Sequence, residues 1–324
     1  MVRALLSFVF YFVALAFVGL CFLGYVRAEV ALLCGIVLAF VRGDVFGAQG
    51  QKVAKHCLAL SIVGMGAGMQ VRSVLDAGVM ATALSALGIV FVLCIGTMLA
   101  RAFKVRGALA HLICVGTAIC GGSAIAAAAP VMRASQSEVS VALGVVFILN
   151  AVALFVFPVI GHALGLGQAE FGLWAAMAIH DTSSVVGAGL SYGAEALEVA
   201  TTTKLVRALW IMPLVLVIPF IWKDARDQHG AGKGAATVKV PWFITGFILA
   251  VIAVSIFPAL QSGGAVVAHY AKDVLVVSLF LIGAGLSKTA LISVGARPFV
   301  FGVCLWLMTS VFALGVVFAL RMFE

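Results

Sequence analysis

Long apolar runs separated by short polar stretches dominate the pattern of this chain. A transmembrane helix needs about 20 consecutive apolar residues, and several of the runs reach that length. The pattern therefore predicts an all-α polytopic membrane protein with about nine to eleven membrane segments. The runs are Ala4–Val26, Val30–Val41, Val53–Met69, Ala77–Ala100, Ala108–Val131, Val139–Ala163, Phe171–Leu190, Val199–Trp222, Pro241–Leu260, Val274–Leu286 and Pro298–Leu320.

Polar residues interrupt two of these runs, from Thr117 to Ser123 and from His180 to Ser184. In lipid, unwound backbone is tolerated only where it is buried in protein or lines a wet cavity. Secondary transporters use such breaks, because the exposed helix ends bind substrates and ions near the bilayer midplane. We therefore expect two broken or re-entrant helices that meet near the midplane.

Basic residues between the runs predict an orientation. Three loops hold clusters of them, at Arg42 to Lys55, at Arg101 to Arg106, and in the Gly- and Ala-rich segment 223–239. The positive-inside rule places these loops in the cytoplasm of a bacterial inner membrane. We expect a cytoplasmic N-terminus, a periplasmic C-terminus and a flexible cytoplasmic loop at 223–239.

The same rule favours re-entrant hairpins at both breaks. The first break has basic residues on both flanks, whereas the loop 161–170 before the second break has no Lys or Arg. Hairpins entering from opposite sides satisfy this distribution, with arms of about a dozen residues that reach the midplane and return. Two crossing, discontinuous helices remain the alternative.

Internal repeats support an inverted arrangement. A shift of 60 positions places the first break on the second and pairs Ser123 with Ser183. A weaker repeat pairs Met65–Met69 with Ile282–Leu286, where Gly-Ala-Gly is equally typical of ordinary helix packing. We expect one integral membrane unit over residues 1–324, with core elements around 107–222 joined by 53–103 and 268–321.

Composition indicates which classes of partner this chain binds. The chain is 64% hydrophobic and 10% charged, whereas a soluble domain carries roughly a quarter charged residues. The bilayer is thus the expected partner, and the net charge of +8 belongs to loops and does not indicate nucleic acid. The seven cysteines have no metal-ligand spacing. We expect no metal site and no cofactor, with Na⁺ or H⁺ as a coupling ion.

The two breaks carry the candidate site. The first offers hydroxyls and backbone amides at a helix N-terminus, which favours an anion. In the second, His180 and Asp181 are candidates for ion coupling, by proton uptake or as a sodium site. The alternatives are a glycine kink at the first break and a helix cap by Asp181 or Ser183 at the second. The predicted substrate-binding residues here are Thr117, Cys120, Gly121, Gly122, Ser123, Thr182, Ser183 and Ser184.

Polar residues on the following runs add candidates. Arg207 lies well inside Val199–Trp222, and a buried guanidinium suits bidentate capture of a carboxylate, sulfonate or sulfate. A salt bridge to a carboxylate is the alternative. Thr203 and Lys204 share its helix face and are secondary candidates. Asn150, also secondary, is more often an interhelical hydrogen bond than a ligand.

The first break, Cys120-Gly-Gly-Ser-Ala-Ile-Ala-Ala-Ala-Ala-Pro130 with Glu138-Val139, resembles a signature of the YeiH-type family, whose members are named sulfate exporters. Ala178-Ile-His-Asp181 with Val185-Val-Gly-Ala-Gly189 resembles its second signature. The family is similar to bile-acid symporters and cation/proton antiporters. The resemblance implies a dimeric, elevator-like transporter with its substrate site at the breaks. This chain has Gly122 and Asp181 where family members usually have Thr or Ala and Glu.

Three classes of function follow. The first is a secondary transporter of a small anion, with sulfate or a sulfonate favoured by the resemblance. The second is an anion channel with the hairpins at its constriction. The third, an intramembrane hydrolase using His180, Asp181 and a serine, is least favoured, because adjacent helical side chains point apart and no Gly-x-Ser-x-Gly motif is present. We therefore expect no enzyme.

Overall fold

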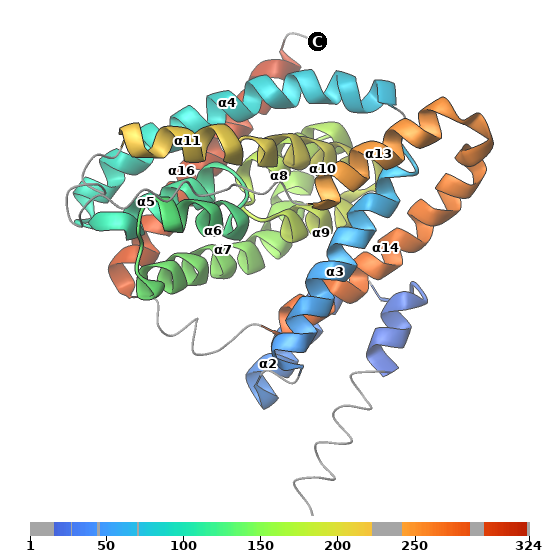
Figure 1. The fold of residues 1–324 in the computed structure, drawn as a ribbon, viewed down its shortest axis with the longest axis horizontal. Coiled ribbons are helices and arrows are strands. Elements are labelled where there is room, and N and C mark those ends of the chain that lie inside the picture. Colours follow the sequence, from blue (N-terminus) through green and yellow to red (C-terminus); the bar gives the residue numbers. More distant parts are fainter. Residues whose placement is uncertain are drawn as a thin grey trace, which may run out of the picture. The chain divides into compact units, whose positions relative to one another are not determined.

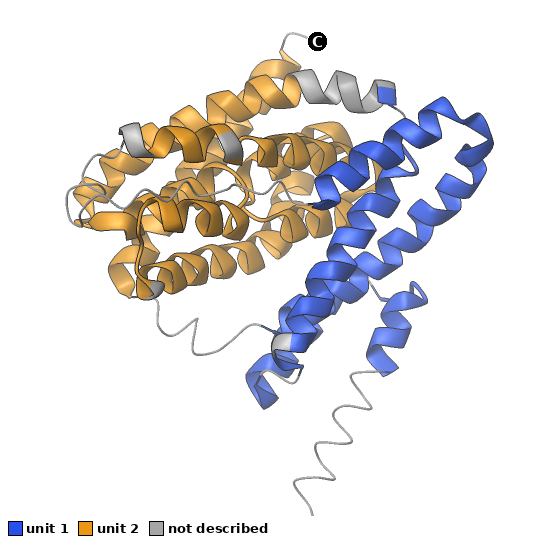
Figure 2. Cartoon of the chain, in the orientation of Figure 1, with its two compact units in different colours: residues 1–74, 241–288 blue, residues 75–240, 289–324 orange. Residues whose placement is uncertain are grey.

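The computed structural model describes residues 16–26, 28–43, 46–69, 71–221, 242–285 and 295–322, and over these ranges it contains helices and no strands. The chain divides into two compact units (Figures 1 and 2): residues 1–74 with 241–288, and residues 75–240 with 289–324. The expected core differs from this division, because 53–74 and 268–288 belong to the first unit. The loop 223–239 and residues 286–294 lie outside the described residues.

Unit 1 is built around one long helix, α14 (Gln261–Ala284), which packs against α2 (Ala28–Arg42) and α3 (Gly47–Gly66). Small residues allow the close approach. A Cβ on Gly35 would lie 2.2 Å from the carbonyl oxygen of Phe280, and one on Gly283 2.5 Å from that of Leu32. The remaining elements are the helical residues 16–22, α13 (Trp242–Ile256) and the 3-10 turn η1 (Pro258–Leu260).

The weaker repeat falls at helix contacts within unit 1. A Cβ on Gly66 would lie 2.9 Å from the carbonyl oxygen of Phe247, and one on Gly68 2.6 Å from the Cβ of Ala268. With Gly283 packed against α2, the glycines of both copies serve helix packing. The helix α14 also extends further than its apolar run, because the mixed stretch Gln261 to Asp273, with polar residues at both ends, is helical too.

Unit 2 holds both polar breaks. The run Ala108–Val131 forms two helices, α5 and α6, and Phe171–Leu190 forms α8 and α9. The run Val199–Trp222 also divides, at Trp210, because Pro213 has no N–H to donate to the carbonyl of Leu209. The helices are α4 (Val71–Ala102, in unit 2 from residue 75), α5 (Gly107–Ala118), α6 (Gly122–Val131), α7 (Gln136–Ala163), α8 (Gln168–Ala178), α9 (Thr182–Tyr192), α10 (Ala194–Leu209), α11 (Ile211–Ile221) and α16 (Ala296–Arg321).

The 60-residue repeat is present in the helix boundaries. The helix before the first break ends at Ala118 and that before the second at Ala178. The helices that follow begin at Gly122 and Thr182. Each boundary therefore recurs 60 positions later, as the sequence predicts.

Five helical stretches among the described residues are long and apolar enough to cross a membrane. The four arms of the breaks are shorter, at 10 to 12 residues each. An arm of this length rises about 15–18 Å, roughly half of the hydrocarbon core. The five stretches are Met80–Ala102, Ser137–Ala163, Ala194–Ile218, Pro258–Ala284 and Ala296–Arg321.

Candidate functional site

The first hairpin, α5–α6, begins and ends beside the start of α7. The carboxylate of Glu138, in the first turn of α7, accepts a hydrogen bond from the amide of Leu109 near the start of α5 (3.3 Å). Glu138 also forms a capping box with Ser135, whose amide donates to it at 2.9 Å. Glu138 therefore caps α7, and the same carboxylate joins the starts of α5 and α7.

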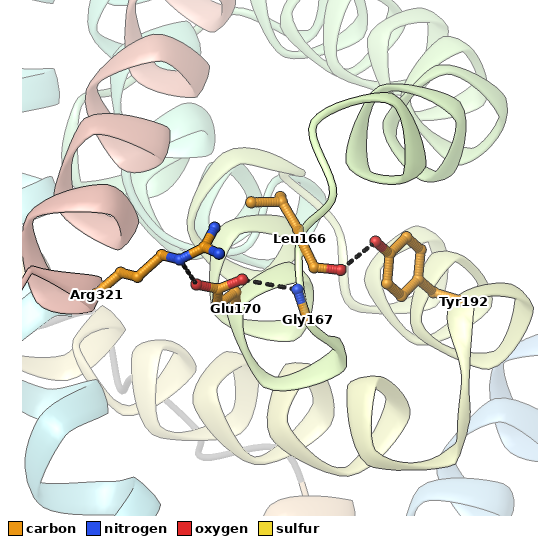
Figure 3. Close-up of polar contacts among 5 residues, drawn as sticks. All are labelled: Leu166, Gly167, Glu170, Tyr192 and Arg321. Atoms are coloured by element: carbon orange, nitrogen blue, oxygen red, sulfur yellow. Dashed lines mark hydrogen bonds and ion pairs between the residues drawn. The ribbon is translucent and has the colours of Figure 1, made fainter. Parts of the chain in front are cut away.

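The second hairpin, α8–α9, begins and ends beside the other end of α7 (Figure 3). The hydroxyl of Tyr192, at the end of α9, donates to the carbonyl of Leu166, just before α8 (2.7 Å). Glu170 accepts from the amide of Gly167 (2.6 Å) and lies 3.6 Å from Nε of Arg321. The two hairpins therefore enter from opposite ends of α7, so the hairpin interpretation is correct and the copies are inverted.

The hairpin tips meet halfway along α7. Nε2 of His180 lies 3.1 Å from Oγ1 of Thr117, which joins the two breaks. Oδ1 of Asn150, in the middle of α7, accepts from the amides of His180 (3.2 Å) and Asp181 (3.3 Å). A Cβ on Gly121 would lie 3.4 Å from the Cβ of His180. Asn150 thus ties the middle of α7 to the backbone of the second break, and its role as a ligand stays a prediction.

The carbonyl ends of α5 and α8 are capped by two cations from α10. Arg207 donates from Nε to Ala118 (2.8 Å), from Nη2 to Thr117 (3.4 Å), and from Nη1 to Ala176 (3.3 Å) and Met177. Nζ of Lys204 donates to Ala176 (3.2 Å) and Ile179 (2.6 Å). Cations stabilise helix C-termini, where the last carbonyls lack intrahelical donors.

These contacts bear on the predicted role of Arg207. An arginine has five N–H groups, and four of them point to backbone carbonyls here. The side chain is 1% exposed. The alternative of a salt bridge is not observed among the described residues, whose ion pair joins Arg321 and Glu170. Direct capture of an anion by Arg207 stays a prediction. In this structure the guanidinium is hydrogen-bonded to the backbone carbonyls of two helix ends.

The two amide ends of the tips differ in charge. The carboxylate of Asp181 caps α9, accepting from the amides of Ser183 (3.2 Å) and Ser184 (3.3 Å) and from both serine hydroxyls. At the corresponding position of α6 stands Gly121, with a φ of +62° and no side-chain cap. Glycine tolerates this left-handed conformation at no steric cost. The α6 tip therefore keeps its positive end, whereas Asp181 neutralises that of α9.

Exposure separates the predicted residues into two sets. Ser123 is exposed, and Gly122, Asp181 and Thr182 are partly exposed, so these four are accessible at the tips. The others are buried behind them: Thr117, Cys120, Gly121, Asn150, His180, Ser183, Ser184, Thr203, Lys204 and Arg207.

Four buried polar atoms of this region have no hydrogen-bond partner among the described residues. They are Nδ1 of His180, Nδ2 of Asn150, and the hydroxyls of Thr201 and Thr202 on α10. Leaving a buried polar group unpaired costs about 1–3 kcal/mol. Such groups are therefore the kind that bound water or a polar ligand satisfies.

Sequence reasoning missed two kinds of supporting residue. Gly88 of α4 lies against the cation, since a Cβ there would lie 3.9 Å from Nη2 of Arg207. Gln168 holds the start of α10, because its Oε1 accepts from the amide of Glu195 (3.0 Å). A glycine inside an apolar run and a glutamine at a helix start are common in membrane proteins, so neither gave a distinctive signal.

Comparison with known proteins places this chain in a family. A family model described as conserved hypothetical protein 698 matches residues 4–302. A UPF0324 membrane protein of Bdellovibrio bacteriovorus is 49% identical over 92% of this chain and 91% of its own length. One of Bacteroides thetaiotaomicron is 45% identical over 91% and 87%. No solved structure matches. The chain thus belongs to the conserved hypothetical protein 698 family of polytopic membrane proteins, which confirms its YeiH-type resemblance.

Proposed function

We propose that this protein is a secondary transporter of a small anion, with elevator-like alternating access coupled to protons or sodium. The observation that carries the proposal is the meeting of two opposed hairpin tips halfway along α7, one tip uncapped and the other capped by a carboxylate. Helix ends within a membrane protein bind ions and substrates in this way. Two unpartnered buried atoms at the tips, Nδ1 of His180 and Nδ2 of Asn150, support a polar occupant.

The α6 tip is the proposed anion site. The amides of Gly122 and Ser123 lie at the positive end of α6, and the Ser123 side chain is accessible. Thr182 lies on the neighbouring tip, and Phe147 lies beside Gly122, with its ring 3.7 Å from a Cβ placed there. The guanidinium of Arg207 adds a positive charge behind the tips, and the basic side chain of Lys204 lies beside it on α10. Sulfate, a sulfonate or a related organic anion is the substrate that the family resemblance favours.

Asp181 is the proposed coupling residue. Its carboxylate is partly exposed, next to the anion site, and is held by four donors of its own helix. Taking up a proton or coordinating Na⁺ would compete with those hydrogen bonds, so coupling and capping use the same oxygens. His180, buried and bonded to Thr117, contributes by joining this tip to the first.

The contacts favour a carrier over the other two classes. A hydrolase needs a carboxylate that orients the histidine base, yet the described hydrogen bonds of the Asp181 carboxylate come from Ser183 and Ser184. Opposed hairpins also suit the constriction of an anion channel. Saturable counterflow in proteoliposomes, measured with the membrane potential clamped to zero, distinguishes the carrier, because only a site that alternates between the two sides couples entry of labelled anion to exit of unlabelled anion.

An aspartate at Ser123 is expected to weaken anion binding at least tenfold. The added carboxylate occupies the positive end of α6 and repels the substrate, while acidic residues near a helix N-terminus favour folding. Binding is measured by thermal shift on purified protein against sulfate, sulfite, thiosulfate, taurine, sulfoacetate and carboxylates, and transport by counterflow. Ser123→Asn is the uncharged control of equal size. Equal anion affinity in the two variants would place the site elsewhere.

The topology has a direct test. With accessible native cysteines replaced, a cysteine at Gly165 is expected to react with an impermeant reagent from the periplasm. One at Ser137 is expected to react from the cytoplasm, because both positions are exposed and lie at opposite ends of α7. Labelling of both from one side would contradict the structure, and the reversed pattern would overturn the proposed inner-membrane orientation. A homodimer with a cytoplasmic N-terminus completes the proposal.

A further inference from the structure

The guanidinium of Arg207 contacts the backbone of both hairpins at once. Nε and Nη2 donate to Ala118 and Thr117, the last residues of α5. Nη1 donates to Ala176 and Met177, near the end of α8. One side chain on α10 therefore holds the carbonyl ends of two helices that enter from opposite ends of α7.

Lys204 lies one turn earlier on α10 and can be compared with Arg207. It is also fully buried, at 0% exposure, and it also donates to main-chain carbonyls. Both of its acceptors, Ala176 and Ile179, belong to the second hairpin. The planar fork of arginine reaches two sets of acceptors, whereas an ammonium is a single point charge. Both side chains are basic and buried. Arg207 joins the two hairpins, whereas Lys204 contacts the second hairpin.

Little else that is polar joins the tips. Among the described hydrogen bonds, the side-chain link is that between Thr117 and His180 at 3.1 Å. Asn150 bonds to the second tip alone, at His180 and Asp181. The carbonyls bound by Arg207 are main-chain atoms of two different hairpins. If the tips separated, some N–H groups of this buried guanidinium would lose their acceptors. Breaking such contacts is costly because the freed groups are buried.

We propose that Arg207 is a positioning residue that ties the two hairpin tips into one moving body. This inference rests on the proposed function and deepens it: the anion site on α6 and the coupling carboxylate of Asp181 are held at a fixed separation and travel together. Arg207 then acts on transport through the backbone, without contacting the substrate. Access to the two sides of the membrane changes by movement of both tips together and never by their separation.

Double electron–electron resonance tests the tie. Spin labels are placed at Ala126 on α6, which is exposed, and at Ser191 on α9, which is partly exposed. Accessible native cysteines are replaced with serine. The wild-type distance distribution is expected to be narrow and to stay in place when sulfate or a pH gradient is added. In Arg207→Lys it is expected to broaden to at least twice the wild-type width, because lysine cannot reach both sets of carbonyls.

The controls separate the tie from other roles. Lys204→Met is expected to keep the narrow distribution, since Lys204 contacts one hairpin. Thr117→Val is also expected to keep it, because Arg207 still joins the tips; broadening here would overturn the proposal without relying on any Arg207 variant. A narrow distribution in Arg207→Lys, with or without lost anion binding, would overturn the tie. The distance measurement needs no substrate, so it stands even if the anion proposal fails.

Discussion

Replacing Asp181 by asparagine is expected to abolish the dependence of transport on an imposed proton or sodium gradient. A carboxamide neither takes up a proton at physiological pH nor supplies a charged ligand to Na⁺. Asparagine is as good an N-cap as aspartate, and its Oδ1 can still accept from Ser183. The variant should therefore fold and still exchange anions across the bilayer. The measurement compares gradient-driven uptake with counterflow in the same proteoliposomes.

The control for Asp181→Asn is Glu195→Gln. Glu195 is an exposed acidic residue at the foot of the same hairpin, away from the tips. Gradient-driven uptake should remain within about twofold of wild type in this variant, since surface charges contribute little to stability or to a distant site. If Asp181→Asn kept its full gradient response, the carboxylate would serve as a helix cap alone, and the coupling site would have to lie elsewhere.

Valine at Gly172 is expected to cause a large loss of stability in unit 2. A Cβ there would lie 2.8 Å from the carbonyl oxygen of Ala196 and 3.1 Å from the amide nitrogen of Ala200, both backbone atoms of α10. Backbone cannot yield as a side chain does, so α8 and α10 must move apart. Overpacking of this kind costs about 3 kcal/mol or more. Thermal unfolding followed by size-exclusion chromatography in detergent measures the loss.

Gly315→Val is the matched control for Gly172→Val. Gly315 is an exposed position inside α16, and a Cβ there meets no atom within 4 Å. Helix propensities of valine and glycine differ by a few tenths of a kcal/mol, so this variant should melt near the wild type. The widened gap in Gly172→Val should also pull Lys204 away from the α8 carbonyls. Equal melting of the two variants would show that α8 and α10 pack less closely than in this structure.

The local pattern of the sequence determined much of the fold. Apolar runs fixed the helices because each must be long and apolar enough to be solvated by lipid. The breaks at Thr117 to Ser123 and His180 to Ser184 stood out because polar residues at that depth need special surroundings. The 60-residue register also predicted that the two breaks correspond, as the helix ends at Ala118 and Ala178 do. These features depend on residues close together in the chain.

Tertiary structure alone decided what the polar groups contact. The second hairpin is closed by the hydrogen bond from Tyr192 to Leu166, 26 residues away. The start of the first is held by the hydrogen bond between Leu109 and Glu138. The acceptors of Arg207 lie 30 to 90 residues away in the chain. They are backbone carbonyls, which carry no sequence signal. Every peptide offers the same carbonyl, so only the packing of α10 against the ends of α5 and α8 could select these. That is why the sequence located the candidate site but left to the fold which charge faces a ligand and which holds the helices together.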